Sequence, residues 1–249
     1  MWSGRPHVYR QDYSQEGLRG LSGRIKDCGL RVSSFLPAFH RYPYSLSSPV
    51  DAIRLDSLQY MRECADNAAI LDAPLLLIVP GRVYHGQTVE DGWLRLAESI
   101  QLTREYCSQY SFQLGLECVN HSELISSASA ARRMIGELGD EGLGVVIDTG
   151  HVNLVSESIE DAVHSAGRLL RHVHVNDNDG VRQQNLVPGD GTFDFKRLID
   201  VLREVGYDGV ITAELDYQYT SDPDEAAALA AQRMREMFDV EPWRSAPRS

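Results

Sequence analysis

Four short apolar segments of this chain each end in a side chain that can bind a divalent metal ion. The segments end at Glu117, Asp148, His174 and Glu214. Moving an uncompensated carboxylate out of water costs several kcal/mol, so three carboxylates at the ends of buried strands require a positive charge among them. A metal ion bound by all four side chains would supply that charge.

The spacing of these four residues is typical of a parallel sheet whose strands are joined by helices. Successive members of the set are 31, 26 and 40 positions apart, and each interval holds a helical pattern. Near-continuous apolar strands separated by helices predict parallel pairing with both faces of the sheet covered. Barrels built in this way carry their chemistry at the carboxyl ends of the strands, where we expect all four side chains.

The apolar segments predict an α/β fold, a (β/α)8 TIM barrel, but with fewer strands than a closed barrel needs. Strands are predicted at residues 30–36, 75–80, 113–118, 144–148, 171–175 and 210–214. Helices are predicted at residues 18–29, 50–71, 90–111, 123–138, 157–170, 194–205 and 223–238. A closed barrel has eight strands, and the first sixteen residues hold no apolar run for the other two. We therefore expect one domain over residues 1–249, a barrel that lacks its first βα unit and most of its second strand, with a frayed tail over residues 239–249.

The composition is that of a globular protein with a sizeable core and an acidic surface. The chain has 249 residues, of which 43% are hydrophobic and 24% charged, and its formal net charge is −12. An acidic surface repels phosphodiester backbones, so we expect no nucleic acid partner. We also expect no membrane span, because no apolar segment has the required length. The four cysteines form no CxxC pair and no dense framework, which favours a reduced, cytoplasmic compartment.

Four segments of the chain carry a resemblance to a known family. They are Trp2-Ser3-Gly4-Arg5-Pro6-His7, Tyr42-Pro43-Tyr44, His172-Val173-His174-Val175-Asn176-Asp177 with Asp179-Gly180, and Pro188-Gly189-Asp190-Gly191. These segments resemble the xylose-isomerase-like TIM barrels of the sugar phosphate isomerase/epimerase superfamily, and within it fructoselysine 3-epimerase and related ketose 3-epimerases. In those relatives the first segment lies at the end of the second barrel strand. The resemblance therefore implies that Met1 and Trp2 belong to that strand, which accounts for the low strand count.

The chain departs from the family pattern at two further positions. Asn185, three residues before Pro188, stands where the relatives often have histidine. The arginine that hexulose 3-epimerases carry six residues after the metal-binding histidine would fall on Gly180. Both departures concern the identity of the substrate rather than the metal site.

The resemblance implies that Glu117, Asp148, His174 and Glu214 bind one divalent ion, with Mn²⁺ preferred to Mg²⁺ or Co²⁺. The ligand types support this independently, because three carboxylates and one imidazole suit an octahedral ion better than a tetrahedral structural zinc. Four protein ligands leave two coordination positions for the C2 carbonyl and C3 hydroxyl oxygens of a ketose. A small sugar is therefore the expected partner, and homo-oligomer formation is left open.

The resemblance also assigns the acid and the base of an epimerisation at C3. Glu117 and Glu214 would lie on opposite faces of C3, where one removes the proton to give a cis-enediolate and the other returns a proton. The substrate contacts that we predict are His151, His7, His85 and Asp177. Among these, His151 is expected to donate a hydrogen bond to the carbonyl end of the sugar.

Alternative interpretations remain at this point. Glu117 or Glu214 taken alone could belong to a structural ion pair at the barrel rim, and His172 is interpreted as a structural residue that faces the helices. A metal-dependent dehydratase or lyase of the same superfamily is the competing enzyme class. An endonuclease-type hydrolase is disfavoured by the net charge of −12. An inactive, N-terminally truncated barrel is the third alternative, since an open barrel exposes strand edges.

Overall fold

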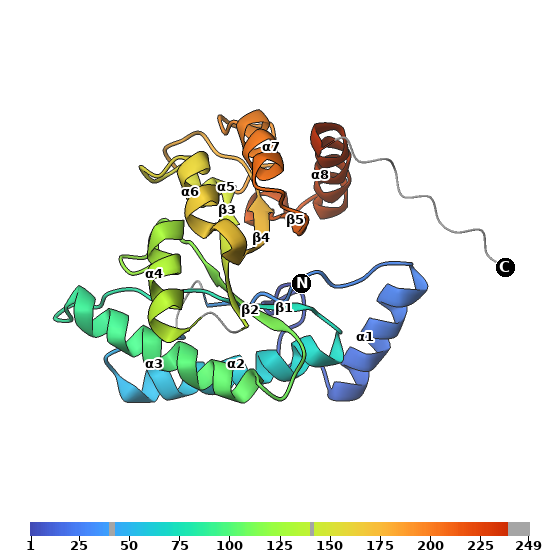
Figure 1. Cartoon of the computed structure of the whole chain (residues 1–249). Helices are drawn as coiled ribbons and strands as arrows, with labels where there is room; N and C mark the ends of the chain where they lie inside the picture. Colours follow the sequence, from blue (N-terminus) through green and yellow to red (C-terminus); the bar gives the residue numbers. More distant parts are fainter. Residues whose placement is uncertain (40–42, 140–141, 239–249) are drawn as a thin grey trace.

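A curled parallel sheet with helices on its outer side forms the centre of the molecule. The computed structural model describes residues 1–39, 43–139 and 142–238, so that Tyr42 and the predicted frayed tail at 239–249 lie outside the described residues. The sheet contains β1 (Leu75–Ile78), β2 (Gln113–Glu117), β3 (Leu143–Asp148), β4 (Leu170–Val175) and β5 (Val210–Ala213). The strands pair in sequence order, and all four pairings are parallel. The arrangement is part of a TIM barrel (Figure 1).

Helices precede the sheet and separate its strands, as the hydrophobic pattern predicts. They are α1 (Gln15–Asp27), α2 (Asp51–Ile70), α3 (Val89–Cys107), α4 (Ala128–Leu138), α5 (Thr149–Val152), α6 (Ile159–Ala166), α7 (Phe195–Glu204) and α8 (Pro223–Phe238), with short 3₁₀ helices η1 (Gly167–Leu169) and η2 (Tyr217–Tyr219). Local capping chemistry determines where several of them begin. The Thr88 hydroxyl accepts a hydrogen bond from Asp91 N, and the Asp91 carboxylate accepts one from Thr88 N in return. This capping box starts α3 one residue before the predicted position.

The predicted strand over residues 30–36 is wrong for most of its length. Only its last two residues pair, Phe35 with Leu76 and Leu36 with Trp2, and both contacts are isolated parallel bridges. Leu30 is 63% exposed. The segment does not extend into a strand because its neighbour on the side away from β1 is the short stretch around Trp2, which offers a single bridge. Trp2 nevertheless lies beside Leu36 in the barrel order, where the resemblance places the second strand.

The four predicted ligands lie at one end of the sheet. Every residue of β1 and β3 is buried, whereas β5 is only partly covered. Glu117 and Asp148 are the last residues of β2 and β3, and Glu214 directly follows β5. In the β3–β4 pairing Asp148 lies opposite His174. The carboxyl ends of four neighbouring strands therefore present these side chains at the same rim.

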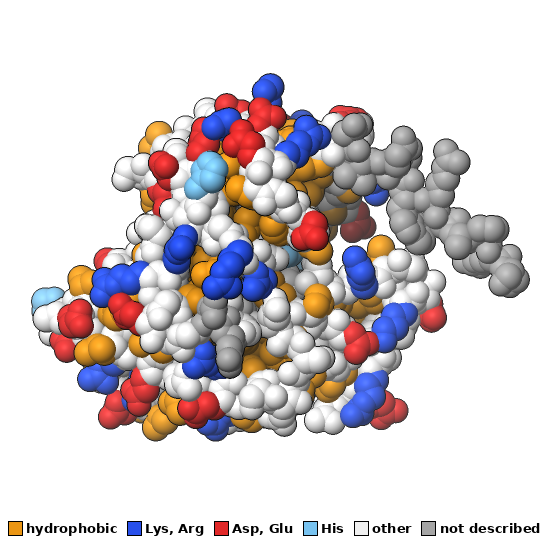
Figure 2. Space-filling view, in the orientation of Figure 1, with side chains coloured by type: hydrophobic (Ala, Val, Ile, Leu, Met, Phe, Trp, Pro, Cys, Tyr) orange, Lys and Arg blue, Asp and Glu red, His pale blue; other side chains and the backbone are white. Residues whose placement is uncertain are grey.

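The surface carries charges of both signs. Figure 2 shows acidic and basic side chains interspersed with apolar ones on one face of the molecule. Within the described ranges, no helix combines the length and apolar character needed to cross a membrane.

Candidate metal centre

The four predicted ligands converge on one point. Each of Glu117, Asp148, His174 and Glu214 offers a ligand atom, and these atoms all lie within 4.8 Å of one another. The first three residues are 1%, 1% and 3% exposed. The side chain of Glu214 is 26% exposed, so Glu214 is the member of the cluster most open to solvent. The prediction that these four residues lie together is confirmed.

Hydrogen bonds within the cluster centre on the imidazole of His174. Its Nδ1 lies 2.9 Å from Glu117 Oε1 and 3.0 Å from Glu214 Oε2. The second carboxylate oxygen of Glu117, Oε2, is buried and has no hydrogen-bond partner. A buried carboxylate oxygen without a partner is costly, and a cation bound to the other oxygen of this carboxylate would reduce that cost.

The electrostatics of the cluster favour a bound positive charge. Burial raises the pKa of Asp148 well above its usual value, and the nearby charge of Glu214 raises it further. Burial alone would lower the pKa of His174, but the carboxylates of Glu214 and Glu117 outweigh it and raise that pKa well above its usual value. Protonated His174 thus supplies positive charge when no metal is bound. Three hard oxygen donors and one imidazole also fit an octahedral Mn²⁺-type ion.

The proton on His174 makes metal binding depend on pH. An imidazole must be neutral to bind a metal ion, so Mn²⁺ has to displace the proton from His174. We expect the affinity for Mn²⁺ to fall as pH is lowered, by up to about tenfold per pH unit for one displaced proton. Calorimetric titration with Mn²⁺ in buffers of different ionisation enthalpy measures the proton release. Binding near neutral pH without proton release would contradict the expectation.

Two hydrogen bonds orient the carboxylate of Asp148. Its Oδ1 accepts from the backbone N of His151 at 2.9 Å, and its Oδ2 accepts from Nδ2 of Asn176 at 2.7 Å. Asn176 is 1% exposed. Its Oδ1 would lie 1.9 Å from a Cβ placed on Gly150, so a glycine is needed there for the amide to reach Asp148. Sequence reasoning missed Asn176; the signal was its position two residues after His174 on the same strand end.

We expect Asn176→Leu to weaken Mn²⁺ binding about tenfold or more, because partners that orient metal ligands typically contribute that much to affinity. Asn153→Leu is a matched control. Asn153 Nδ2 donates to Asn178 Oδ1 at 2.8 Å and to Thr192 Oγ1 at 3.2 Å, so its side chain is engaged away from the four ligands. Calorimetry on both variants makes the comparison. Equal affinity in Asn176→Leu and wild type would show that Asp148 is held without it.

His151 lies directly beside the metal ligands. It belongs to α5, which starts immediately after Asp148, and it is 4% exposed. Its Nδ1 lies 2.7 Å from Oδ1 of Asn120. The residue is therefore placed as a substrate contact requires, and that role stays a prediction.

The two other predicted histidine contacts lie on exposed loops. The ring of His7 packs edge-on against Trp2, with ring centroids 5.8 Å apart. His85 lies in the turn between β1 and α3. Across the described residues, no hydrogen bond or ion pair joins either histidine to the four ligands. Their contacts with substrate stay predictions.

Asp177 is occupied by the loop that follows β4. Its carboxylate accepts four backbone hydrogen bonds at 2.9 to 3.0 Å, from the N–H groups of Asn178, Gly189, Gly191 and Phe193. The side chain is 1% exposed. We therefore propose that Asp177 holds this loop in place, and that a direct contact with the sugar is not its main role.

Asp177→Ala is expected to lower the free energy of unfolding by about 2–4 kcal/mol, because it leaves four backbone N–H groups of the loop without their acceptor. Asp177→Asn keeps one acceptor oxygen and should cost less. Urea denaturation of the two variants tests this order. An unchanged unfolding free energy combined with weaker sugar binding would restore Asp177 as a substrate contact.

The interpretation of His172 as a residue facing the helices is wrong. Residues two apart on a strand point to the same face, and the rings of His172 and His174 lie 5.0 Å apart. His172 is 1% exposed, and its Nε2 has no hydrogen-bond partner. Burial, with a smaller contribution from the charge of His174, lowers the pKa of His172 to about 3. A neutral imidazole thus packs beneath the metal cluster.

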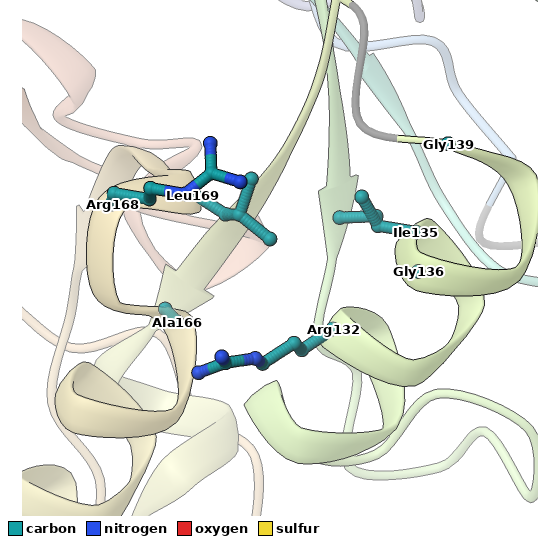
Figure 3. A pocket seen from close by; sticks show the side chains of 7 residues that line it. All are labelled: Arg132, Ile135, Gly136, Gly139, Ala166, Arg168 and Leu169. Carbon is teal, nitrogen blue, oxygen red and sulfur yellow. The ribbon is translucent and has the colours of Figure 1, made fainter.

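An open cavity lies at the other end of the sheet, between α4 and η1 (Figure 3). It is lined by Arg132, Ile135, Gly136, Gly139, Ala166, Arg168 and Leu169. Nη1 of Arg132 donates to the carbonyl of Ser165 at 3.0 Å. Helices α4 and α6 both end here, and cationic side chains near helix C-termini stabilise the last carbonyls. The cavity therefore belongs to the packing of helix ends rather than to the metal cluster.

Comparison with known proteins agrees with this arrangement. Residues 1–237 match the family described as xylose isomerase-like TIM barrel. Fructoselysine 3-epimerase of Escherichia coli O157:H7 is 24% identical over 240 residues, which cover 96% of this chain and 87% of that protein. L-ribulose-5-phosphate 3-epimerase of Escherichia coli is 25% identical over 222 residues, which cover 89% and 77%.

Solved structures show the same fold. The crystal structure of a D-tagatose 3-epimerase-like protein superimposes with a TM-score of 0.79 at 19% identity, covering 91% of this chain and 84% of that one. The two curated relatives are sugar 3-epimerases, which are isomerases acting on carbohydrates. From the family match over nearly its whole length, this chain belongs to the xylose isomerase-like TIM barrel family.

Proposed function

We propose that this protein is a divalent-metal-dependent 3-epimerase that acts on a ketose or a fructosamine. The observation that carries the proposal is the convergence of Glu117, Asp148, His174 and Glu214 within 4.8 Å at the strand ends. The curated relatives, which act on fructoselysine and L-ribulose 5-phosphate, support a ketose with its carbonyl at C2. We propose Mn²⁺ as the metal, with Mg²⁺ or Co²⁺ as substitutes.

The bound ion would be held by all four side chains and would act as a Lewis acid on the sugar carbonyl. Asp148 serves only as a ligand, because both of its oxygens are oriented by hydrogen bonds from His151 and Asn176. His174 serves as a ligand through its ring nitrogen. Glu117 and Glu214 each have a second oxygen that is not needed for binding the ion. These two residues are therefore the candidates for proton transfer.

Epimerisation needs a base on one face of C3 and an acid on the other. In one direction Glu117 accepts the C3 proton, the electron pair of the C–H bond forms the cis-enediolate, and Glu214 donates a proton to the opposite face. In the other direction the two carboxyl groups exchange roles. Glu117 Oε2 is suited to this task because it is buried and has no hydrogen-bond partner. After one turnover Glu117 carries the proton and Glu214 has lost one, so the pair returns to its starting state when the proton of Glu117 passes to Glu214, either directly or through solvent at the more exposed Glu214.

Two features of the chain support the proposed compartment and the proposed partner. All four cysteines, Cys28, Cys64, Cys107 and Cys118, are unpaired thiols, which suits a reducing cytoplasm. The formal net charge of −12 favours a small sugar over a polyanionic partner. We propose a cytoplasmic enzyme of carbohydrate metabolism.

Deuterium uptake tests the proposed reaction on many candidate sugars at once. The Mn²⁺-loaded protein is incubated in D₂O with a panel of ketoses and fructosamines, and the products are analysed by NMR. We expect deuterium at C3 together with the C3 epimer of at least one compound. A dehydratase would instead give a product that has lost a hydroxyl group. Absence of C3 exchange across the panel would contradict the proposal.

A further inference from the structure

The backbone of His151 is fixed against one of the metal ligands. Its N–H donates to Asp148 Oδ1 at 2.9 Å, as the first turn of α5 requires. The peptide of Asn153 closes the same turn by donating to the carbonyl of Thr149 at 2.9 Å. The ring of His151 therefore leaves a backbone whose position is tied to the metal cluster. Two properties of the side chain are not fixed by this backbone: the rotation of the ring, and which of its two nitrogens carries the proton.

The side-chain oxygen of Asn120 restricts both properties. Nδ1 of His151 lies 2.7 Å from Oδ1 of Asn120. With this amide oxygen as the acceptor, Nδ1 is the donor and carries the proton. A neutral imidazole has one proton, which leaves Nε2 as a hydrogen-bond acceptor. The sequence predicts that His151 donates a hydrogen bond to the sugar carbonyl. In this tautomer its Nε2 cannot do so, because Nε2 carries no proton.

Asn120 is held on a short, well-anchored loop after β2. Backbone hydrogen bonds join Val119 N to the carbonyl of Ile125 at 2.9 Å and Ser122 N to the carbonyl of Val119 at 2.9 Å. The hydroxyl of Ser122 also donates to the carbonyl of Gly81 at 2.8 Å. These bonds position the amide before any substrate arrives. The oxygen that selects the proton position on His151 is thus part of the rigid rim.

Oδ1 of Asn120 also contacts a second imidazole, that of His121. Nδ1 of His121 lies 3.3 Å from Asn120 Oδ1, and the rings of His121 and His151 meet edge to face with centroids 5.9 Å apart. His121 thus limits rotation of the His151 ring on one side.

We infer that Asn120 is a positioning residue, which accepts a hydrogen bond from Nδ1–H of His151 and thereby makes Nε2 an acceptor for a hydroxyl group of the sugar. The identity of the ligand as a hydroxyl-bearing ketose rests on the proposed function. The assignment of the proton on His151 does not, because it follows from the contact with Asn120 in the protein itself.

The proton position is measured by two-bond ¹⁵N–¹H correlation NMR. The protein is labelled with ¹⁵N-histidine and loaded with Mg²⁺, which is diamagnetic, at about pH 8, above the usual histidine pKa of about 6.5. The His151 signals are assigned from their absence in His151→Gln. We expect the Nδ1–H form in wild type and a mixture of tautomers in Asn120→Leu. Asn153→Leu is the matched control and should keep the wild-type pattern.

Kinetics supply the second readout. With the ketose found in the deuterium screen, Asn120→Leu should raise KM about tenfold, as expected for one lost hydrogen bond, with a smaller change in kcat and an unchanged affinity for Mg²⁺. Asn120→Asp retains an acceptor oxygen and should restore the Nδ1–H form. A purely structural role would lower metal affinity and stability without altering the tautomer.

Two results would overturn the inference. One is an Nε2–H tautomer for His151 in wild type, and the other is an unchanged tautomer in Asn120→Leu. If Asn120→Leu does not fold, Asn120→Asp decides: protonation at Nδ1 supports the inference, and protonation at Nε2 alone overturns it. The spectra are recorded without sugar, so a failure to find epimerase activity would refute the proposed function while leaving this test intact.

Discussion

Replacing Glu117 with glutamine is expected to slow interconversion of the C3 epimers by about 10³-fold, because an amide cannot take up the C3 proton. General acid–base catalysis typically contributes about 10²–10⁴-fold. Both directions should be affected equally, since Glu117 acts as base in one and as acid in the other. Glu214→Gln should behave in the same way. The measurement is the initial rate of epimer formation, followed by NMR, with Mn²⁺ at a saturating concentration so that weaker metal binding does not contribute.

Deuterium uptake then shows on which face of C3 each of the two carboxylates acts. In each variant, the epimer whose C3 hydrogen faces the altered residue should lose exchange with D₂O. Glu105→Gln is a suitable control, because Glu105 lies on the exposed side of α3 and accepts from Gln101 at 3.0 Å. Thermal melts confirm that the variants are folded. Interconversion at the wild-type rate in Glu117→Gln or Glu214→Gln would show that the acid and base are other residues.

Removing the metal is expected to have the second largest effect. Exhaustive chelation with EDTA should abolish epimerisation, and addition of Mn²⁺ should restore it. The sugar would then have no Lewis acid at its carbonyl, and the carboxylates of Glu117 and Glu214 would lose the cation that holds them in position for proton transfer. Full activity after chelation would rule out the metal mechanism.

Chelation should also lower stability. A ligand that binds only the folded state at 100 times its dissociation constant adds about 2.7 kcal/mol to the free energy of unfolding. Urea denaturation with and without Mn²⁺ measures this difference. Asp148→Asn should remove most of it, because the metal loses a charged ligand while the hydrogen bond from the backbone of His151 can remain.

The metal cluster could be predicted from the sequence because strand burial leaves a strong local pattern. The run Val145-Val146-Ile147 is wholly buried in β3 and ends at Asp148. The equivalent run before Glu117 is buried along β2, with only Gln113 exposed. Parallel strands of this kind must present their carboxyl ends at one rim. Sequence spacing was therefore sufficient to bring the four ligands together.

Two predictions are wrong, the strand over residues 30–36 and the orientation of His172. The first depends on a contact between segments that are distant in the sequence, and the second does not. The pairing of Phe35 and Leu36 is limited by the short stretch around Trp2, which the apolar content of residues 30–36 does not reveal. His172 needs no such contact, because the two-residue period of a strand places it on the same face as His174. The sequence therefore contains the information needed to orient this side chain correctly.

The amides around the site could not be predicted in the same way. Asn120 meets His151 across 31 positions, and Asn176 meets Asp148 across 28. The two-residue period of β4 places Asn176 on the same side as His174 but does not name its partner, and Asn120 carries no periodic signal at all. The role of Asp177 depends on four N–H groups from its own loop. Only the folded loop shows that this carboxylate is already satisfied.

Anomalous diffraction from crystals soaked in Mn²⁺ tests the central claim most directly. The account predicts one strong manganese peak per chain, bonded to Glu117, Asp148, His174 and Glu214, with two coordination positions open to water or sugar oxygens. A chain with no peak among these four side chains, or with its manganese bound elsewhere, would contradict it.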